Sequence, residues 1–156
     1  PRSGAVAPDE AFQNGVAAGT AGTVVDYIHA QHNPLLEVNA RSGPALVVID
    51  AEVGRPIALD ASQSHDPDGQ SRHYNWFHYG EAGSTDANLA AVSISGAGTA
   101  KATVTATAVF RPQWLPRGQC PGTGTAHIIL AVTDEGSPRL TSYRRVILTV
   151  RPGSAQ

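Results

Sequence analysis

Two acidic turns hold the residues whose types and spacing are best suited to binding a cation. Asp66 and Asp68 lie two residues apart in a turn with Pro67 and Gly69, and Asp134 and Glu135 follow a long apolar stretch. Ca²⁺ prefers six to eight hard oxygen ligands, so carboxylates from two turns at one end of a fold would suit it. Asp and Gly are equally common in tight turns that bind nothing. Two interpretations therefore stay open: a Ca²⁺ site at Asp66, Asp68, Asp134 and Glu135, or two structural turns.

Aromatic side chains are the second group with a clear chemical use. Phe77 and Tyr79 alternate with Tyr74 and Trp76, so the two pairs are expected on opposite faces of one strand. Trp114 lies in a loop rich in Pro, Gly and Arg. Flat exposed rings suit sugars because the faces of a pyranose ring are apolar. We predict a carbohydrate-binding surface made of Phe77, Tyr79 and Trp114, with packing of Trp114 under its own loop as the alternative.

The sequence gives little support for catalysis. It contains no Gly-x-Ser-x-Gly nucleophile elbow. Glu81 and Asp66 would form a carboxylate pair for glycoside hydrolysis, but nothing in the sequence sets their separation. The histidines near the first acidic turn, His65, His73 and His78, lack a further convergent ligand for zinc. We predict that the chain is not an enzyme, with a small metal-dependent hydrolase as the weaker alternative.

The overall composition limits the classes of partner. The 156 residues suffice for one domain and an arm, and a net charge of −2 from 11 basic and 13 acidic residues gives no electrostatic case for nucleic acid. There is no apolar run of transmembrane length. Cys120 is the only cysteine, so an internal disulfide is excluded. Because the chain starts at Pro1 and has no methionine, we expect a processed protein or a fragment of a larger one.

Short segments of alternating polarity, separated by turn residues, indicate an all-β domain. We predict an antiparallel Ig-like β-sandwich over residues 33–152, preceded by an N-terminal arm or linker over 1–32 and followed by a tail over 153–156. A short helix is expected over 23–30, because Val24, Val25 and Ile28 share a helical face. The predicted strands are 35–38, 45–49, 56–60, 73–79, 91–94, 102–107, 125–133 and 143–150.

The same alternation predicts which side chains form the core. The outward set includes His127, Ile129, Arg145 and Thr149. Thr103, Thr105 and Thr107 form an outward row of hydroxyls, which either contacts a polysaccharide or only reflects the β-propensity of threonine. The inward set is Ile57, Leu59, Tyr74, Trp76, Val104, Ala106, Ile128, Leu130, Val132, Val146, Leu148 and Val150.

Several motifs in order resemble a known type of domain. Leu59-Asp-Ala-Ser-x-Ser-x-Asp-Pro-Asp-Gly69, then Tyr74-x-Trp76, then Val132-Thr-Asp134 resembles the PKD and cadherin-like Ig-fold modules. Trp76-Phe-x-Tyr-x-Glu-Ala-Gly83, His127-Ile-Ile-Leu-x-Val-Thr-Asp134 and Gly136-Ser-Pro-x-Leu-Thr-x-Tyr-Arg-Arg-Val146 are similar to the C-terminal Ig-like domain of secreted cellulose-binding proteins. Those proteins carry a nucleoside-hydrolase-like domain in front.

The resemblance implies an accessory module of an extracellular, carbohydrate-associated protein, without catalytic residues of its own. The hydrolase metal motif, Asp-x-Asp-x-x-x-Asp-Asp, would end at Arg72 and His73 in this chain. We therefore expect a secreted or cell-surface module that binds a cellulose-type glycan or positions a neighbouring domain. The alternative is a structural subunit of a surface fibre or array, which self-associates when the N-terminal arm adds as a strand to a neighbour. We expect no nucleic-acid partner and no membrane insertion.

Overall fold

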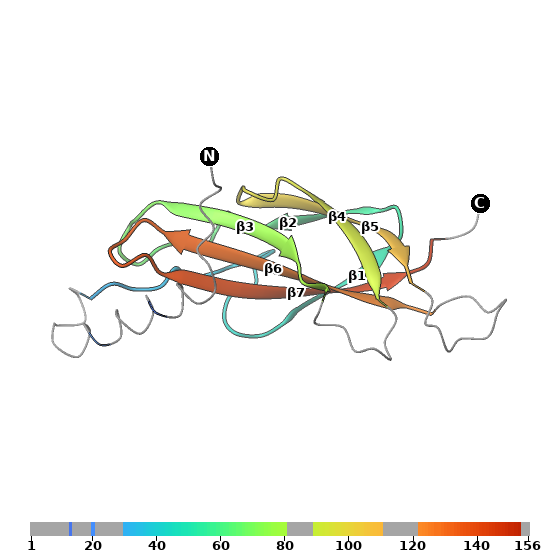
Figure 1. Cartoon of the computed structure of the whole chain (residues 1–156), viewed down its shortest axis with the longest axis horizontal. Helices are drawn as coiled ribbons and strands as arrows, with labels where there is room; N and C mark the ends of the chain where they lie inside the picture. The colour runs from blue at the N-terminus through green and yellow to red at the C-terminus, as the bar shows by residue number, and fades with distance from the viewer. Residues whose placement is uncertain (1–12, 14–19, 21–29, 81–88, 111–121, 154–156) are drawn as a thin grey trace.

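The computed structural model of the chain describes residues 13, 20, 30–80, 89–110 and 122–153. Within these residues, seven strands form two sheets that lie one over the other (Figure 1). The strands are β1 (Val47–Glu52), β2 (Pro56–Asp60), β3 (Arg72–His78), β4 (Ala90–Ser95), β5 (Lys101–Val109), β6 (Gly124–Asp134) and β7 (Thr141–Arg151).

The sheet topology is that of an Ig-like β-sandwich, which confirms the predicted fold class. One sheet has the strand order β1-β7-β6-β3 and the other has the order β2-β5-β4. The described strand pairs are antiparallel except for β1, which runs parallel to β7 from Val47 opposite Val146 to Glu52 opposite Arg151. This parallel pair is a detail that the sequence-based prediction did not specify. Alternation shows which face a residue takes, but it carries no information on strand direction.

The predicted core is confirmed by the burial of the inward side chains. Ile57 and Tyr74 are partly buried and pack against it, while the other members of the predicted inward set are at most 2% exposed. Trp76 on β3 joins the two sheets, because its Nε1 donates a hydrogen bond of 2.9 Å to the carbonyl oxygen of Thr99 between β4 and β5. A buried tryptophan at the third strand is a usual feature of Ig domains.

The predicted strand over Leu35–Val38 is wrong. Within the described residues this segment makes only isolated bridges to neighbouring turns. The chain reverses after Val38 because Asn39 and Ala40 take positive φ angles of 49° and 59°. Asn39 stabilises the reversal, since its side-chain oxygen accepts a hydrogen bond of 2.8 Å from the backbone N–H of Asp60.

Several predictions concern residues that the structure does not describe. The arm and the short helix over 23–30 fall outside the described residues, apart from residues 13, 20 and 30–32, and so do Glu81, Trp114 and Cys120. None of the described helical residues belongs to a helix long and apolar enough to cross a membrane.

Candidate functional site

The outward side of the four-stranded sheet carries large apolar and aromatic side chains, and we call it the apolar face. These side chains alternate along β1, β3, β6 and β7 with the buried residues of the core. Across the sheet, Phe77 lies opposite Ile129, and Ile129 lies opposite Arg145. The members of the apolar face are Val48, Phe77, Tyr79, Ile129, Tyr143 and Ile147.

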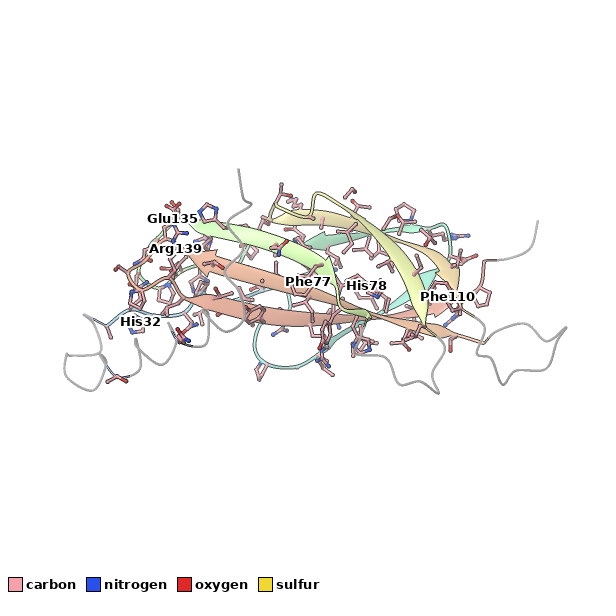
Figure 2. All side chains as sticks on the ribbon, viewed as in Figure 1. His32, Phe77, His78, Phe110, Glu135 and Arg139 are labelled. Atoms are coloured by element: carbon pink, nitrogen blue, oxygen red, sulfur yellow. The ribbon has the colours of Figure 1, made fainter. Side chains whose placement is uncertain are left out.

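The structure brings Phe77 and Tyr79 together on this face, on the outward side of one strand. Phe77 is partly exposed, and Tyr79 is 41% exposed. Figure 2 shows Phe77 near the C-terminal end of β3, about midway along the sandwich. The backbone N–H of Tyr79 donates a hydrogen bond of 2.8 Å to the carbonyl oxygen of His127, which continues the pairing of β3 with β6. Trp114, the third predicted sugar-binding residue, lies outside the described residues.

Tyr143 on β7 belongs to the apolar face and was not predicted. Its side chain is 49% exposed, and partial burial raises the pKa of its hydroxyl. The signal was present in the sequence, because Val146, Leu148 and Val150 point inward and residues at odd positions of the same strand must point outward.

Burial and neighbouring positive charge disfavour the protonated form of His127, the histidine on this face. Burial lowers the pKa of His127, and the positive charges of Arg145 and His78 lower it further. Burial also lowers the pKa of His78. These shifts reduce the positive charge near Phe77 and Tyr79, while Arg145 stays charged in the same cross-strand row as Phe77. An aromatic surface with little charge suits a neutral partner with apolar faces.

The first acidic turn is organised by the carboxylate of Asp66, which is only 6% exposed. Its Oδ1 accepts hydrogen bonds from the backbone N–H groups of Asp68 (2.9 Å) and Gln70 (3.2 Å). Its Oδ2 is buried without a hydrogen-bond partner among the described residues. Burial raises the pKa of Asp68, but hydrogen bonds from the side chain and backbone of His32 outweigh this effect and hold the pKa below its ordinary value.

The second acidic turn lies at the same end of the sandwich as the first, because Arg72 at the start of β3 pairs with Asp134 at the end of β6. Figure 2 shows Glu135 at this end. Asp134 is fully buried, and its Oδ1 accepts two backbone N–H groups of its own loop at 3.0 and 2.9 Å. Its Oδ2 accepts a hydrogen bond of 3.3 Å from Gln31, whose amide also bonds to that of Gln70. Glu135 pairs with His73 at 2.8 Å on the surface. The acidic residues thus join the two turns and the chain before β1.

Comparison with protein families identifies the chain. Residues 56–150, more than half of the chain, match the family described as the C-terminal domain of the cellulose-binding protein Sde0182. The chain belongs to this family. Membership confirms the resemblance inferred from the sequence motifs.

This member of the Sde0182 C-terminal domain family is also similar to part of a larger solved protein. That protein is a nucleoside hydrolase-related hypothetical protein from Saccharophagus degradans, associated with carbohydrate metabolism, with 37% sequence identity and a TM-score of 0.73. The similarity covers 90% of this chain and 31% of the other, so the chain spans about a third of the length of that protein.

More distant similarities are to two further solved structures. A PKD domain solved in solution is 23% identical, with a TM-score of 0.43, over 74% of this chain and 96% of the other. A three-domain fragment of a mouse clustered protocadherin is 17% identical, with a TM-score of 0.39, over 76% of this chain and 33% of the other. No curated protein sequence is a significant match to this chain.

The geometry of the acidic turns in this family member does not by itself form a metal cage. Among the described residues, no group of three or more His, Cys, Asp or Glu side chains could hold a metal ion. An ion shared by Asp66, Asp68 and Asp134 would have to displace His32 from Asp68 or Gln31 from Asp134. Calcium binding at the four predicted carboxylates therefore stays a prediction.

Proposed function

We propose that the chain is a non-catalytic accessory module that acts outside the cell and binds a cellulose-type polysaccharide through its apolar face. The observation that carries the proposal is that Phe77 on β3, partly exposed, and Tyr79 just after β3, exposed, lie on the same outward side in a member of the Sde0182 C-terminal domain family. Their rings offer flat apolar contact to pyranose faces, as aromatic anchors do at other binding sites. Trp114, which follows β5 in the sequence, is the third proposed contact.

The polar neighbours of the rings support the same use. Asn75 lies two residues before Phe77 on the outward side of β3, and Arg145 lies in the same cross-strand row as Phe77. Both side chains can donate hydrogen bonds to sugar hydroxyls. A few polar groups around an apolar surface are typical of small-molecule and glycan sites, where they set the orientation of the ligand.

Retention of the purified chain on insoluble cellulose tests the proposal. We expect the double variant Phe77→Ala, Tyr79→Ala to lose retention, and Trp114→Ala in combination with Tyr79→Ala to lose it as well. A matched control is Thr103→Ala, Thr107→Ala on the opposite outer surface, which removes side chains from exposed strand positions but no ring. Failure of the unaltered chain to be retained, or equal retention of all variants, would overturn the proposal.

Assembly by strand addition is a second candidate, favoured by one observation. Residues 141–145 of β7 have no described strand beside them on the side away from β6, because β1 pairs with β7 only from Val146. Light scattering of the full chain and of a variant lacking residues 1–29 tests whether the arm drives self-association. The deletion spares Gln31 and His32, which bond to the acidic turns. A monomer in both cases would exclude this candidate.

A further inference from the structure

A groove of about 690 Å³ lies beside the first residues of β7. It exists because β1 joins β7 only at Val146 and leaves residues 141–145 uncovered on one side. The segment 34–37 lines the groove as well, and it is held in place because Leu35 exchanges two backbone hydrogen bonds with His65, of 2.8 and 3.0 Å. The volume is within the range of about 300–1,000 Å³ that ligand sites in proteins have.

Apolar side chains make up much of the groove lining, and they join it to the apolar face. Leu35 and Leu46 line the groove and are 54% and 55% exposed. Tyr143 belongs both to the groove and to the apolar face, and its ring is half-exposed. Tyr143 lies two strands away from Asn75 of β3, a separation of about 10 Å across the sheet. The groove therefore continues the aromatic surface of Phe77 and Tyr79.

A buried arginine beside the groove lacks one of its acceptors. Arg144 lines the groove and is only 7% exposed. Its Nη2 donates to the carbonyl oxygens of Arg41 and Ser42 at 3.3 and 3.4 Å, but its Nε is buried with no hydrogen-bond partner among the described residues. Leaving a buried charged donor unpaired is unfavourable. An acceptor oxygen from a ligand would remove this penalty.

Other polar side chains along the groove supply further donors and acceptors. Arg145 can donate hydrogen bonds, and Glu37 can accept them. Ser42 and Ser142 add hydroxyl groups that can do either. The groove thus combines a tyrosine ring and leucine side chains with opposite charges, which suits a neutral ligand that has apolar faces and many hydroxyls.

We propose that this groove binds a short stretch of β-1,4-linked glucan, with a pyranose ring stacked on Tyr143. The hydroxyl oxygens of the sugar accept hydrogen bonds from Arg144 and Arg145, and its hydroxyl groups donate to Glu37. The assignment rests on the proposed function, because it extends the same polysaccharide site from the apolar face into the groove.

A peptide that adds as a strand to β7 fits the groove less well. Strand addition needs a continuous row of free backbone groups. The carbonyl oxygen of Thr141, at the start of the uncovered edge, already accepts a hydrogen bond of 3.3 Å from the side chain of Asn33. Arg144 and Glu37 also offer more polar contacts than a backbone edge requires.

Isothermal titration of the full chain with cellohexaose tests the groove. We expect Tyr143→Ala to weaken binding about tenfold, because it removes the stacking ring. Tyr143→Phe keeps the ring and should retain most of the affinity. Thr103→Ala, on the other outer surface, is the control for an exposed strand position. Thermal melting of each variant shows whether it is folded, and Tyr143→Phe gives a second measurement if Tyr143→Ala unfolds.

The possible results separate failure of the groove from failure of the proposed function. If the unaltered chain binds neither cellohexaose nor cellulose, the proposed function is overturned and the groove assignment with it. If cellulose retention depends on Phe77 and Tyr79 but Tyr143→Ala binds cellohexaose normally, only the groove assignment is overturned. If the chain binds polygalacturonate and not cellohexaose, the assignment of a neutral glucan to the groove is overturned. If Tyr143→Ala changes the mass of the particle in solution but leaves glucan binding unchanged, the glucan assignment is overturned and the groove is a protein–protein contact.

Discussion

The outer side of β2-β5-β4 is lined by short hydroxyl side chains, whereas the outer side of β1-β7-β6-β3 is lined by aromatic and branched ones. On the first, which we call the hydroxyl face, Thr103 and Thr105 of β5 lie opposite Ser95 and Ser93 of β4. On the second, the apolar face, outward Phe77 of β3 lies opposite outward Ile129 of β6. Both sheets cover the same core, so folding alone does not account for the difference.

The difference is the reason for proposing that the apolar face, and not the hydroxyl face, binds a partner. Threonine on an exposed strand favours β structure without adding apolar surface, so the hydroxyl face needs no partner. The exposed rings of Tyr79 and Tyr143 and the partly exposed ring of Phe77 add nothing that an Ig-like sandwich requires. Clustered apolar surface that stays accessible is typical of binding sites. Composition of the outward positions is therefore a better guide to function here than the core.

The largest expected effect is the difference in stability between truncating Leu130 in the core and truncating its neighbour Ile129 on the apolar face. Leu130 is fully buried, so we expect Leu130→Ala to lower the free energy of unfolding by about 3 kcal/mol, through lost burial and a residual cavity. Ile129 is partly exposed on the apolar face, and Ile129→Ala should cost about 1 kcal/mol or less. Urea denaturation measures both. Equal costs would mean that the apolar face is covered in the free protein.

A calcium ion bound at the acidic turns would stabilise one sheet more than the other. Asp66 precedes β3 and Asp134 ends β6, so a bound ion would stabilise the four-stranded sheet in particular. If the site is saturated a hundredfold above its dissociation constant, removal of calcium should lower stability by about 2.7 kcal/mol. Calorimetric melting with and without EDTA measures this, with Asp68→Asn as the control that should abolish the response. An unchanged melting temperature would leave the turns with a structural role alone.

Local patterns were sufficient to predict most strands and the two outer faces. Strand β2 spans Pro56–Asp60 as predicted, because its alternation is bounded by clear turn residues on both sides. The same alternation placed Phe77 outward and Trp76 inward. Each of these features is set by residues close together in the sequence, so it can be predicted from the sequence alone.

Features that depend on distant contacts were not predictable. The pairing of β1 with β7 depends on segments about a hundred residues apart, and it alone decides where the groove beside Tyr143 begins. The reversal at Asn39 and Ala40 depends on a hydrogen bond to Asp60 and removed a predicted strand. Alternation places Arg144 inward with Val146, but its hydrogen bonds to the carbonyl oxygens of Arg41 and Ser42 depend on a segment about a hundred residues away. No local periodicity encodes these contacts.

The two sheets should lose stability at different pH values. The pKa of His127 is lowered in the folded protein, so as the pH falls below about 6.5 the unfolded chain binds a proton first and stability decreases. Asp60, at the end of β2, has its pKa lowered to about 2, mainly by hydrogen bonds from Ser62 and also by Lys101. The ionised Asp60 side chain contributes fully to the free energy of unfolding above its unfolded pKa, near 3.9. This contribution declines below that pH and is lost as the pH falls through about 2.

Melting temperatures between about pH 7 and pH 2 measure these two steps. We expect His127→Gln to reduce the loss of stability below about pH 6.5 and to leave the more acidic step unchanged. Asp60→Asn should do the reverse. If His127→Gln lost as much stability below about pH 6.5 as the unaltered chain, His127 would not be the cause of that step, and the predicted difference between the sheets would be wrong.

The smallest expected effect on stability comes from making the hydroxyl face apolar. Each of Thr103→Val, Thr105→Val and Thr107→Val replaces a hydroxyl by a methyl group at an outward position of β5, and each should change stability by no more than about 0.5 kcal/mol. The triple change gives this face an apolar row without a single ring. Introduced into the Phe77→Ala, Tyr79→Ala variant, it should not restore retention on cellulose, because stacking on a sugar needs a flat ring and not apolar surface in general. Restored retention would show that apolarity, and not aromatic geometry, separates the two faces.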